Sequence, residues 1–511
     1  MHLAVTPAWP FHADSTSLGA LSEDAIRLQA RVRMRNTKRL DHGQIPSRSA
    51  DTRTMKKAMA LIIRTHERID MPEITKGLVD DLRHAHADEL ALARNAATQM
   101  GIETASLNRE AIQHTTTAIS HRLDEWKATS QKKSGRCWLF SSLNLLRSRA
   151  RVSLGVKNFE FSQSYVFFWD KFERANWFLT DIIATADEPV DGRLVQFLLA
   201  DVLGDGGQWD MAASIYMKYG LVPKEVMPES EASTNSRPMN ARLCAVLRVG
   251  ALRLREAIAG GADTEEIDAK RREILADVWK ILVVSLGEPP ARFNWQWRDD
   301  EGNFHRDGEV TPHEFYEAHV GVDLSDYICL VDDPRPENPK GSMETVEHLG
   351  NVVGGRPIRY LNAPIDAIKR IAAEQIVAGE PVWFGADVSQ PYDRGLGFFV
   401  TGIHDYDRLF GVDFSSTKLE RVRSGESAMD HAMLFTGVDL DEAGAPRAWR
   451  VENSWGEEPG DSGFFTMDDQ WFTDNVFEVV VRKSALPAEL AASLDKDPIV
   501  LPAWDPMGTL A

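Results

Sequence analysis

The chain has 511 residues, of which 43% are apolar and 26% are charged, and its formal net charge is −19. These fractions are close to those of ordinary globular proteins, and the length is sufficient for a large core divided over more than one subdomain. No run of eighteen apolar residues occurs, which argues against a membrane span, and the acidic balance argues against nucleic acid as a partner because it repels phosphate groups.

Only three cysteines occur, Cys137, Cys244 and Cys329. This odd and sparse count argues against a disulfide framework and favours a reducing compartment. The first residues also lack the charged segment followed by an apolar segment that marks a secretory signal. We therefore expect a cytoplasmic protein in which Cys244 and Cys329 belong to the core.

Residues 1–73 form an N-terminal extension with little apolar periodicity. They hold 12 Lys and Arg against 8 Asp and Glu, so the acidic excess lies in the rest of the chain. Such a segment is predicted to be disordered or partly helical, with a short helix over residues 55–69. No function is assigned to it.

Residues 74–230 are predicted to form a helical half. Leu78, Leu82 and Leu90 are separated by charged residues, a pattern that indicates amphipathic helices at its start. Residues 138–152 (WLFSSLNLLRSRARV) predict a longer helix with its leucines on one side.

A second core helix is predicted over residues 193–203, and residues 231–345 are predicted to be an inserted helical subdomain. Within the insertion, residues 237–287 have helical periodicity with a break at two glycines, after which Asp263 can cap the second helix. This helical hairpin could pack in the core or form an arm for assembly.

Residues 346–484 are predicted to form a β-rich half. Apolar or alternating segments indicate its strands, at residues 380–388, 431–438, 448–452, 463–466 and 476–481. The tail that follows, residues 485–511, contains four prolines, which exclude a long helix or a central strand.

Three residues in these segments suggest nucleophilic catalysis: Cys137, His431 and Asn453. Only a thiolate attacks well, and Cys137 would stand at a helix N-terminus, where unpaired N–H groups favour negative charge. An imidazolium at His431 would lower the thiol pKa further and then protonate the leaving amine. Asn453 would fix the tautomer and orientation of the imidazole.

Two nearby side chains complete the predicted site. Gln131 supplies a side-chain N–H that, together with the backbone N–H of Cys137, can hold a developing oxyanion. Trp455 could cover the hydrogen bond between His431 and Asn453. Asp430, beside His431, could raise the pKa of the imidazolium or else face solvent.

The motifs around these residues resemble those of the bleomycin hydrolase and aminopeptidase C family of papain-like cysteine peptidases. The resemblance covers residues 74–511 and rests on residues 108–110, 124–127, 131–140, 161–165, 168–171, 205–211, 431–433, 453–456 and 502–511. It implies an α+β papain-like fold, in which a helical half faces a β-barrel-like half, with a large helical insertion and a C-terminal tail that enters the active-site cleft.

The resemblance also implies the roles of further residues. Asp205, Gly206, Gly207 and Ala432 are expected to bind substrate, and the terminal carboxylate of Ala511 is expected to pair with the substrate's α-ammonium. The resembled family forms homohexamers through inserted helices, which favours the reading of the helical hairpin as an assembly arm. The His and Asp residues show no metal-ligand spacing, so no metal or cofactor is expected.

The sequence thus predicts a cytoplasmic, homohexameric cysteine aminopeptidase. It would act on peptides through a thioester and show bleomycin-hydrolase-like amide hydrolysis. One alternative is a papain-like endopeptidase or acyltransferase that uses the same residues. Another is a hexameric binding or chaperone-like protein with incidental hydrolysis.

Overall fold

The structure is a computed structural model that describes residues 72–86, 90–123 and 126–510. Residues 1–85 and 86–511 are separate units, and each is considered by itself. In the first unit, the described part is the start of helix α3 (Lys76–His86). The predicted helix over residues 55–69 and the terminal Ala511 lie outside the described residues.

The second unit contains a set of long helices and a set of shorter ones. The long helices are α7 (Cys137–Leu154), α8 (Gln163–Ala184), α12 (Arg237–Ala259), α13 (Thr264–Leu286) and α15 (Ile365–Val377). The shorter ones are α4 (Ala91–Met100), α5 (Ile102–Ser106), α6 (Arg109–His114), α9 (Arg193–Ala200), α10 (Trp209–Tyr219), α11 (Glu231–Thr234), α14 (Pro312–His319), α16 (Tyr406–Phe410), α17 (Lys418–Ser424), α18 (Asp469–Asn475) and α19 (Ala488–Ala491).

In the described part of the chain, eleven strands form one sheet in the order β13-β5-β6-β4-β12-β7-β9-β10-β11-β8, with β1 paired to β9. The strands are β1 (His121–Arg122), β4 (Tyr327–Val331), β5 (Met343–Val346), β6 (Tyr360–Asn362), β7 (Val382–Ala386), β8 (Phe398–Phe399), β9 (His431–Leu440), β10 (Pro446–Glu452), β11 (Phe464–Asp468), β12 (Val476–Arg482) and β13 (Ile499–Leu501). A separate hairpin joins β2 (Phe293–Arg298) and β3 (Phe304–Val310).

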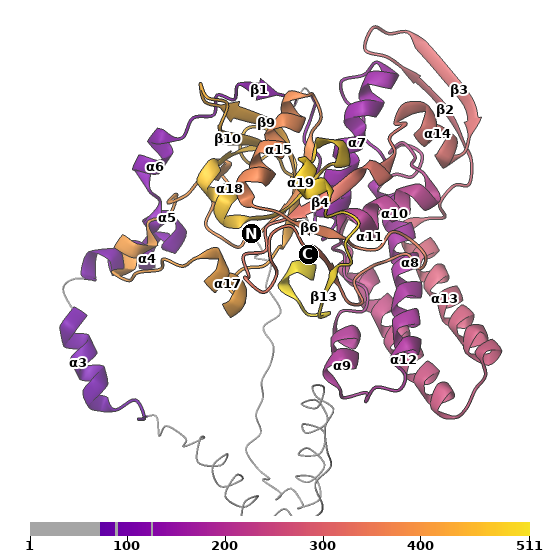
Figure 1. The fold of residues 1–511 in the computed structure, drawn as a ribbon, viewed down its shortest axis with the longest axis horizontal. Helices are drawn as coiled ribbons and strands as arrows, with labels where there is room; N and C mark the ends of the chain where they lie inside the picture. The colour runs from indigo at the N-terminus through magenta and orange to yellow at the C-terminus, as the bar shows by residue number, and fades with distance from the viewer. Residues whose placement is uncertain (1–71, 87–89, 124–125, 511) are drawn as a thin grey trace, which may run out of the picture. The chain divides into compact units, whose positions relative to one another are not determined.

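Within this unit, helices α7 to α13 gather on one side and most of the sheet on the other (Figure 1). One apolar cluster fills the space between them and includes Cys137, Trp138 and Leu434. A second cluster lies on the other face of the sheet, where it includes Ile371 of α15 and Phe472 of α18. The helical region and the sheet therefore meet at the first cluster.

The helical hairpin also forms as predicted. Helix α12 ends before Gly260 and Gly261, and α13 begins after Asp263, whose side chain accepts a hydrogen bond from the backbone N–H of Glu266 (2.9 Å). An aspartate at this position satisfies one of the unpaired N–H groups of the first turn. The two helices pack on α8.

The predicted boundary at residues 345 and 346 does not match the distribution of elements. Strand β4 precedes it and β5 spans it, yet β4 pairs with β12 and β5 pairs with β6 in the main sheet. The range 231–345 also contains the β2–β3 hairpin and is therefore not wholly helical. Local periodicity did not predict that these strands join the main sheet, because their pairing partners are decided by distant segments of the chain.

A buried carboxylate joins the two halves. Glu452, at the end of β10, accepts hydrogen bonds from Arg147 of α7 (2.5 Å), from Asn144 of α7 (2.9 Å) and from the indole of Trp126 (2.7 Å). Arg147 and Glu452 are each at most 3% exposed. The network therefore ties the helix that begins at Cys137 to the strand that ends immediately before Asn453.

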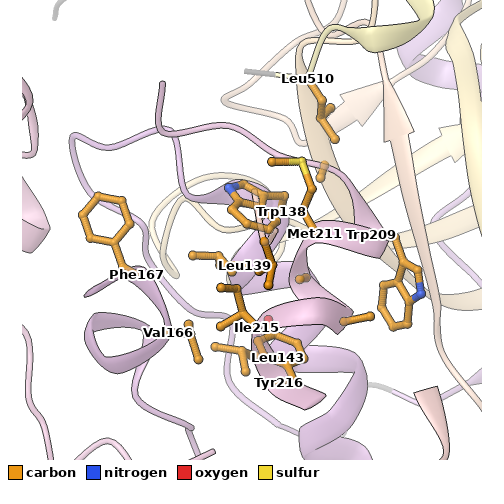
Figure 2. Packing of buried hydrophobic residues seen from close by; sticks show 14 of the residues in the cluster. Trp138, Leu139, Leu143, Val166, Phe167, Trp209, Met211, Ile215, Tyr216 and Leu510 are labelled. Carbon is orange, nitrogen blue, oxygen red and sulfur yellow. The ribbon is translucent and has the colours of Figure 1, made fainter. Parts of the chain in front are cut away.

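The C-terminal tail packs along the sheet and then enters the cluster between the halves. Strand β13 pairs in parallel with β5, and Asp505 accepts two hydrogen bonds from Arg335 (2.7 and 2.8 Å). Leu510 is 7% exposed and belongs to the same cluster as Trp138 and Met211, as Figure 2 shows. A tail in this position is part of the core and not a frayed end.

We expect Glu452→Gln to lower the free energy of unfolding by about 3–5 kcal/mol, because it leaves the Arg147 guanidinium buried without its counter-charge. Denaturant unfolding of the full chain, with the exposed Glu458→Gln as a control, measures this effect. A loss below about 1 kcal/mol for Glu452→Gln would show that the contact does not hold the halves together.

A second buried acid gives a pH dependence to stability. Burial raises the pKa of Glu478 on β12 to about 8; the thiol of Cys329 opposes this shift, and the carboxylate of Asp210 adds to it. Between about pH 4.5 and 8 the folded chain keeps a proton that the unfolded chain loses, so stability falls as pH rises through this window.

Glu478→Gln removes this titration. We therefore expect the variant to lose less stability than the wild type between pH 5 and pH 9, as measured by denaturant midpoints. The exposed Glu374→Gln serves as a control. Equal losses in all three proteins would refute a buried neutral acid at Glu478.

Candidate active site

The structure brings the three predicted catalytic residues together from distant parts of the chain. Cys137 is the first residue of α7, His431 is the first residue of β9, and Asn453 directly follows β10. All three side chains are buried. The backbone N–H of Ala432 faces the sulfur of Cys137, which places the thiol at the start of the strand that carries His431.

The surroundings of Cys137 act on the thiol in opposite directions. Burial raises its pKa to about 12, the backbone N–H groups of Ala432 and Trp138 lower it, and the carboxylate of Asp430 raises it again. We expected the helix N-terminus and His431 to lower this pKa. The N–H groups do act in that direction, but burial outweighs them.

His431 is held by Asn453 and covered by Trp455. Its Nε2 atom hydrogen-bonds Oδ1 of Asn453 (2.9 Å), and the Trp455 ring stacks on the imidazole with centroids 5.0 Å apart. Because an amide oxygen only accepts, Nε2 carries the hydrogen and Nδ1 remains available for a proton from Cys137. Burial lowers the pKa of His431 to about 4; the bond to Asn453 opposes this shift, and the charge of Arg394 adds to it.

Gln131 lies beside this group with its amide fixed at both ends. Its Nε2 atom donates to the carbonyl of Ser134 (2.5 Å), and its Oε1 atom accepts from the hydroxyl of Ser454 (2.5 Å). The backbone N–H of Gln131 also donates to the carbonyl of Ser454 (2.8 Å). The amide still has a second hydrogen to offer, as an oxyanion donor requires.

Asp430 does not act as either of the two alternatives stated for it. Its Oδ1 atom accepts from the backbone N–H of Val388 (2.7 Å). Burial raises its pKa to about 7, the Val388 N–H opposes this shift, and the nearby Asp387 carboxylate adds to it. Its charge also raises the pKa of Cys137.

The carboxylate of Asp205 is already occupied. It forms a buried ion pair with Lys171 (2.7 Å) and accepts from Ser236, from Asn240 (2.6 Å) and from the backbone N–H of Gly135 (3.2 Å). Burial alone would raise the pKa of Asp205, but Lys171 and the two side-chain hydrogen bonds hold it well below its usual range. The side chain therefore positions the loop before Cys137, and the contact of Asp205 with substrate stays a prediction.

The two following glycines are constrained by packing. The carbonyl of Gly206 accepts from Arg174 (2.6 Å), and a Cβ atom on Gly207 would lie 2.8 Å from the Trp138 ring. Gly207 thus lets the loop approach the first turn of α7. Its backbone stays our prediction for contact with a substrate chain.

The end of the tail lies close to the substrate-binding residue predicted on β9. Gly385 of β7 is the register partner of Ala432. A Cβ atom built on Gly385 would lie 3.7 Å from Leu510. The carboxylate of Ala511 lies outside the described residues. Within those residues, no group of three or more His, Cys, Asp or Glu side chains is arranged to hold a metal ion, and none of the helices is long and apolar enough to cross a membrane.

Sequence reasoning missed several residues that support the site. Ser454 orients Gln131, Glu452 joins the two halves, and Arg136 is fully buried in a bidentate pair with Glu229 (3.0 and 2.8 Å). Ser454 lies inside the recognised motif, but nothing local identifies its partner. The one sequence feature that could have pointed to Arg136 was its position, as a charged residue directly before Cys137.

This arrangement can carry out acyl transfer from an amide to Cys137. The thiol gives its proton to Nδ1 of His431 as the sulfur attacks, and the backbone and Gln131 donors face the oxygen that becomes negative. The imidazolium then protonates the departing amine, and water regenerates the thiol from the thioester.

We expect Gln131→Ala to lower kcat about 10²- to 10³-fold on an aminoacyl coumarin amide, because one oxyanion donor is lost. Ser454→Ala should lower kcat less, and the double variant should be no slower than Gln131→Ala, because Ser454 acts through Gln131. If the two losses in kcat multiply in the double variant, Ser454 does not act through Gln131. Unchanged melting temperatures serve as the folding control.

Comparison with known proteins agrees with this geometry. The model of the Peptidase C1-like family matches residues 73–508. Aminopeptidase C of Lactobacillus delbrueckii subsp. lactis is 44% identical over 423 residues, which cover 82% of this chain and 94% of that protein. Bleomycin hydrolase of Homo sapiens is 44% identical over 432 residues, which cover 83% and 95%.

A solved structure shows the same fold. PepW from Lactobacillus rhamnosis superposes with a TM-score of 0.84 at 44% identity, covering 86% of this chain and 99% of PepW. The α+β papain-like fold that the sequence predicted is confirmed. The chain belongs to the Peptidase C1-like family of cysteine peptidases.

Proposed function

We propose that the protein is a cysteine aminopeptidase that removes N-terminal residues from peptides through a thioester at Cys137. The observation that carries the proposal is the tail, whose penultimate residue, Leu510, is buried near the strand position of Ala432. Because the tail fills the cleft on one side of Cys137, the cleft can accept only a substrate whose N-terminus lies next to the tail.

In this proposal His431 and Asn453 form the catalytic pair with Cys137, and Gln131 assists at the oxyanion. The neutral thiol and neutral imidazole of the resting site are suited to a proton transfer that accompanies attack, since burial disfavours separate charges. The same low polarity strengthens the donors that face the oxyanion.

The carboxylate of Ala511 is the proposed anchor for the substrate's α-ammonium. Leu510 and Met507 are buried, so the backbone that leads to the last residue is fixed. A charge-assisted hydrogen bond from the α-ammonium to a fixed carboxylate contributes about 1.5–3 kcal/mol, which corresponds to about 10- to 100-fold in selectivity. Bleomycin-hydrolase-like amide hydrolysis would be a side activity of the same site.

The proposal extends to assembly and location. Val249 and Leu252 of α12 and Val284 of α13 are exposed apolar residues on the helical hairpin, with Val284 88% exposed. Such residues support a homohexamer built through this hairpin. All three cysteines are free, which supports a reducing, cytoplasmic location. Sedimentation of the full chain would distinguish a hexamer from a monomer.

The test compares alanyl coumarin amide with its N-acetyl form as substrates. We expect the wild type to cleave the free-amine substrate at least about 100-fold faster. Deleting Leu510 and Ala511 should reduce this preference to less than about tenfold, because the anchor and the plug are both lost. Cys137→Ala should be inactive on both substrates.

Other outcomes separate the alternatives. Equal cleavage of both substrates by the wild type would make the tail an ordinary terminus and the protein an endopeptidase. Full activity of Cys137→Ala would overturn the catalytic assignment. Transfer of the alanyl group to an added amine in preference to water would favour an acyltransferase.

A further inference from the structure

An arginine lies one aromatic ring away from the catalytic histidine. The segment between β7 and β9 reaches the site at Tyr392 and Arg394. The guanidinium of Arg394 lies over the Trp455 ring at 4.5 Å, and Trp455 in turn stacks on His431 at 5.0 Å. The positive charge is close enough to lower the pKa of His431, in addition to the larger effect of burial.

Arg394 is exposed and makes no hydrogen bond or ion pair with any residue that the structure describes. The acids around it have other partners. Asp393 accepts from the backbone N–H of Leu396 (2.7 Å), and Glu103 contacts His404 (3.4 Å) and the hydroxyl of Tyr406 (2.9 Å). Asp430 is bound to Val388 and has a pKa raised to about 7 by burial.

Arg394 and the tail lie on different faces of the sheet. Leu510 belongs to the cluster between the halves, together with Cys137 and Ala432. Trp455 and Tyr392 pack instead against the cluster on the other face. A substrate that lies across Cys137 with its amine at the tail therefore has its leaving fragment on the side of Trp455.

We propose that Arg394 binds the α-carboxylate of the leaving fragment and so makes the enzyme favour dipeptides and tripeptides with a free C-terminus. The proposal rests on the aminopeptidase function proposed above. An extended chain advances about 3.3–3.6 Å per residue. The Arg394 guanidinium is separated from His431 only by the Trp455 ring. It is therefore within reach of the α-carboxylate of a fragment that ends one or two residues after the cleaved bond.

The chemistry of the guanidinium suits this role. Its planar fork matches a carboxylate in bidentate geometry, and the stacked indole holds the plane of the fork while leaving its edge free. Longer peptides and C-terminal amides would lack the charged contact but would still reach Cys137. The effect should therefore appear as a change in KM and not in kcat.

The test compares Ala-Phe and Ala-Phe-Ala, each with a free carboxylate and as the C-terminal amide, in the full chain. We expect the wild type to favour the acids about tenfold or more in kcat/KM. Arg394→Gln should abolish this preference through KM, and Arg394→Glu should reverse it. Arg370→Gln, which changes an exposed arginine of α15 far from the site in sequence, should leave it unchanged.

Alanyl coumarin amide, whose leaving group has no carboxylate, separates specificity from structural damage. The ratio of its kcat/KM to that of Ala-Phe amide should be the same in the wild type and Arg394→Gln, because the loss of the charge near His431 affects both substrates equally. An equal loss on every substrate would show that Arg394 only supports Trp455 and would overturn the proposal. Retention of the preference for acids in Arg394→Gln would overturn it as well.

Binding to the inactive Cys137→Ala protein tests Arg394 independently of turnover. Calorimetry should show tighter binding of Ala-Phe than of its amide, and the difference should vanish in Cys137→Ala/Arg394→Gln. A wild type that binds the acid in this way but cleaves no free-amine substrate would refute the aminopeptidase function while leaving the Arg394 site intact. Equal binding of acid and amide would refute the site alone.

Discussion

The geometry of the site depends on one buried carboxylate, that of Glu452. The nucleophile begins a helix in one half of the molecule, while the base and its orienting amide belong to strands of the other half. Neither half alone fixes the distance between them. Glu452 accepts from Arg147 and Asn144 of the nucleophile's helix and precedes Asn453 in the chain. A shift between the halves would therefore leave buried charges unpaired, which is costly.

The same principle recurs around the nucleophile. Arg136 is paired with Glu229, and Asp205 with Lys171, and both pairs hold the loop that leads into α7. The Arg136 and Lys171 side chains are fully buried, so removing either acid would cost more than the pair itself contributes. The side chains of Cys137 and His431 are buried as well. Paired charges thus hold the structure around these two residues in place.

Much of this could be predicted from the sequence, since it depends on local pattern. Helix α7, the hairpin of α12 and α13, and strands β7, β9, β10 and β12 follow apolar periodicity and capping residues. The identities and order of Cys137, His431 and Asn453 followed from chemistry together with flanking motifs. Strands β4 and β5 were not placed, because their pairing is set by residues far away in the chain.

The side-chain contacts that the sequence did not predict have the same origin. The partners of Asp205 are Lys171, Ser236 and Asn240, which lie far from it in the sequence. Ser454 and Gln131 are 323 positions apart. Burial of Cys137 depends on the closing of both halves, which is why the rise in its pKa could not be inferred from its helix position alone.

The position of the tail also affects the protein's biosynthesis. Leu510 is synthesised after every other residue of the cleft described above. Every other element of the cleft precedes it and can fold first. The two halves can therefore assemble during synthesis before Leu510 fills its place between them.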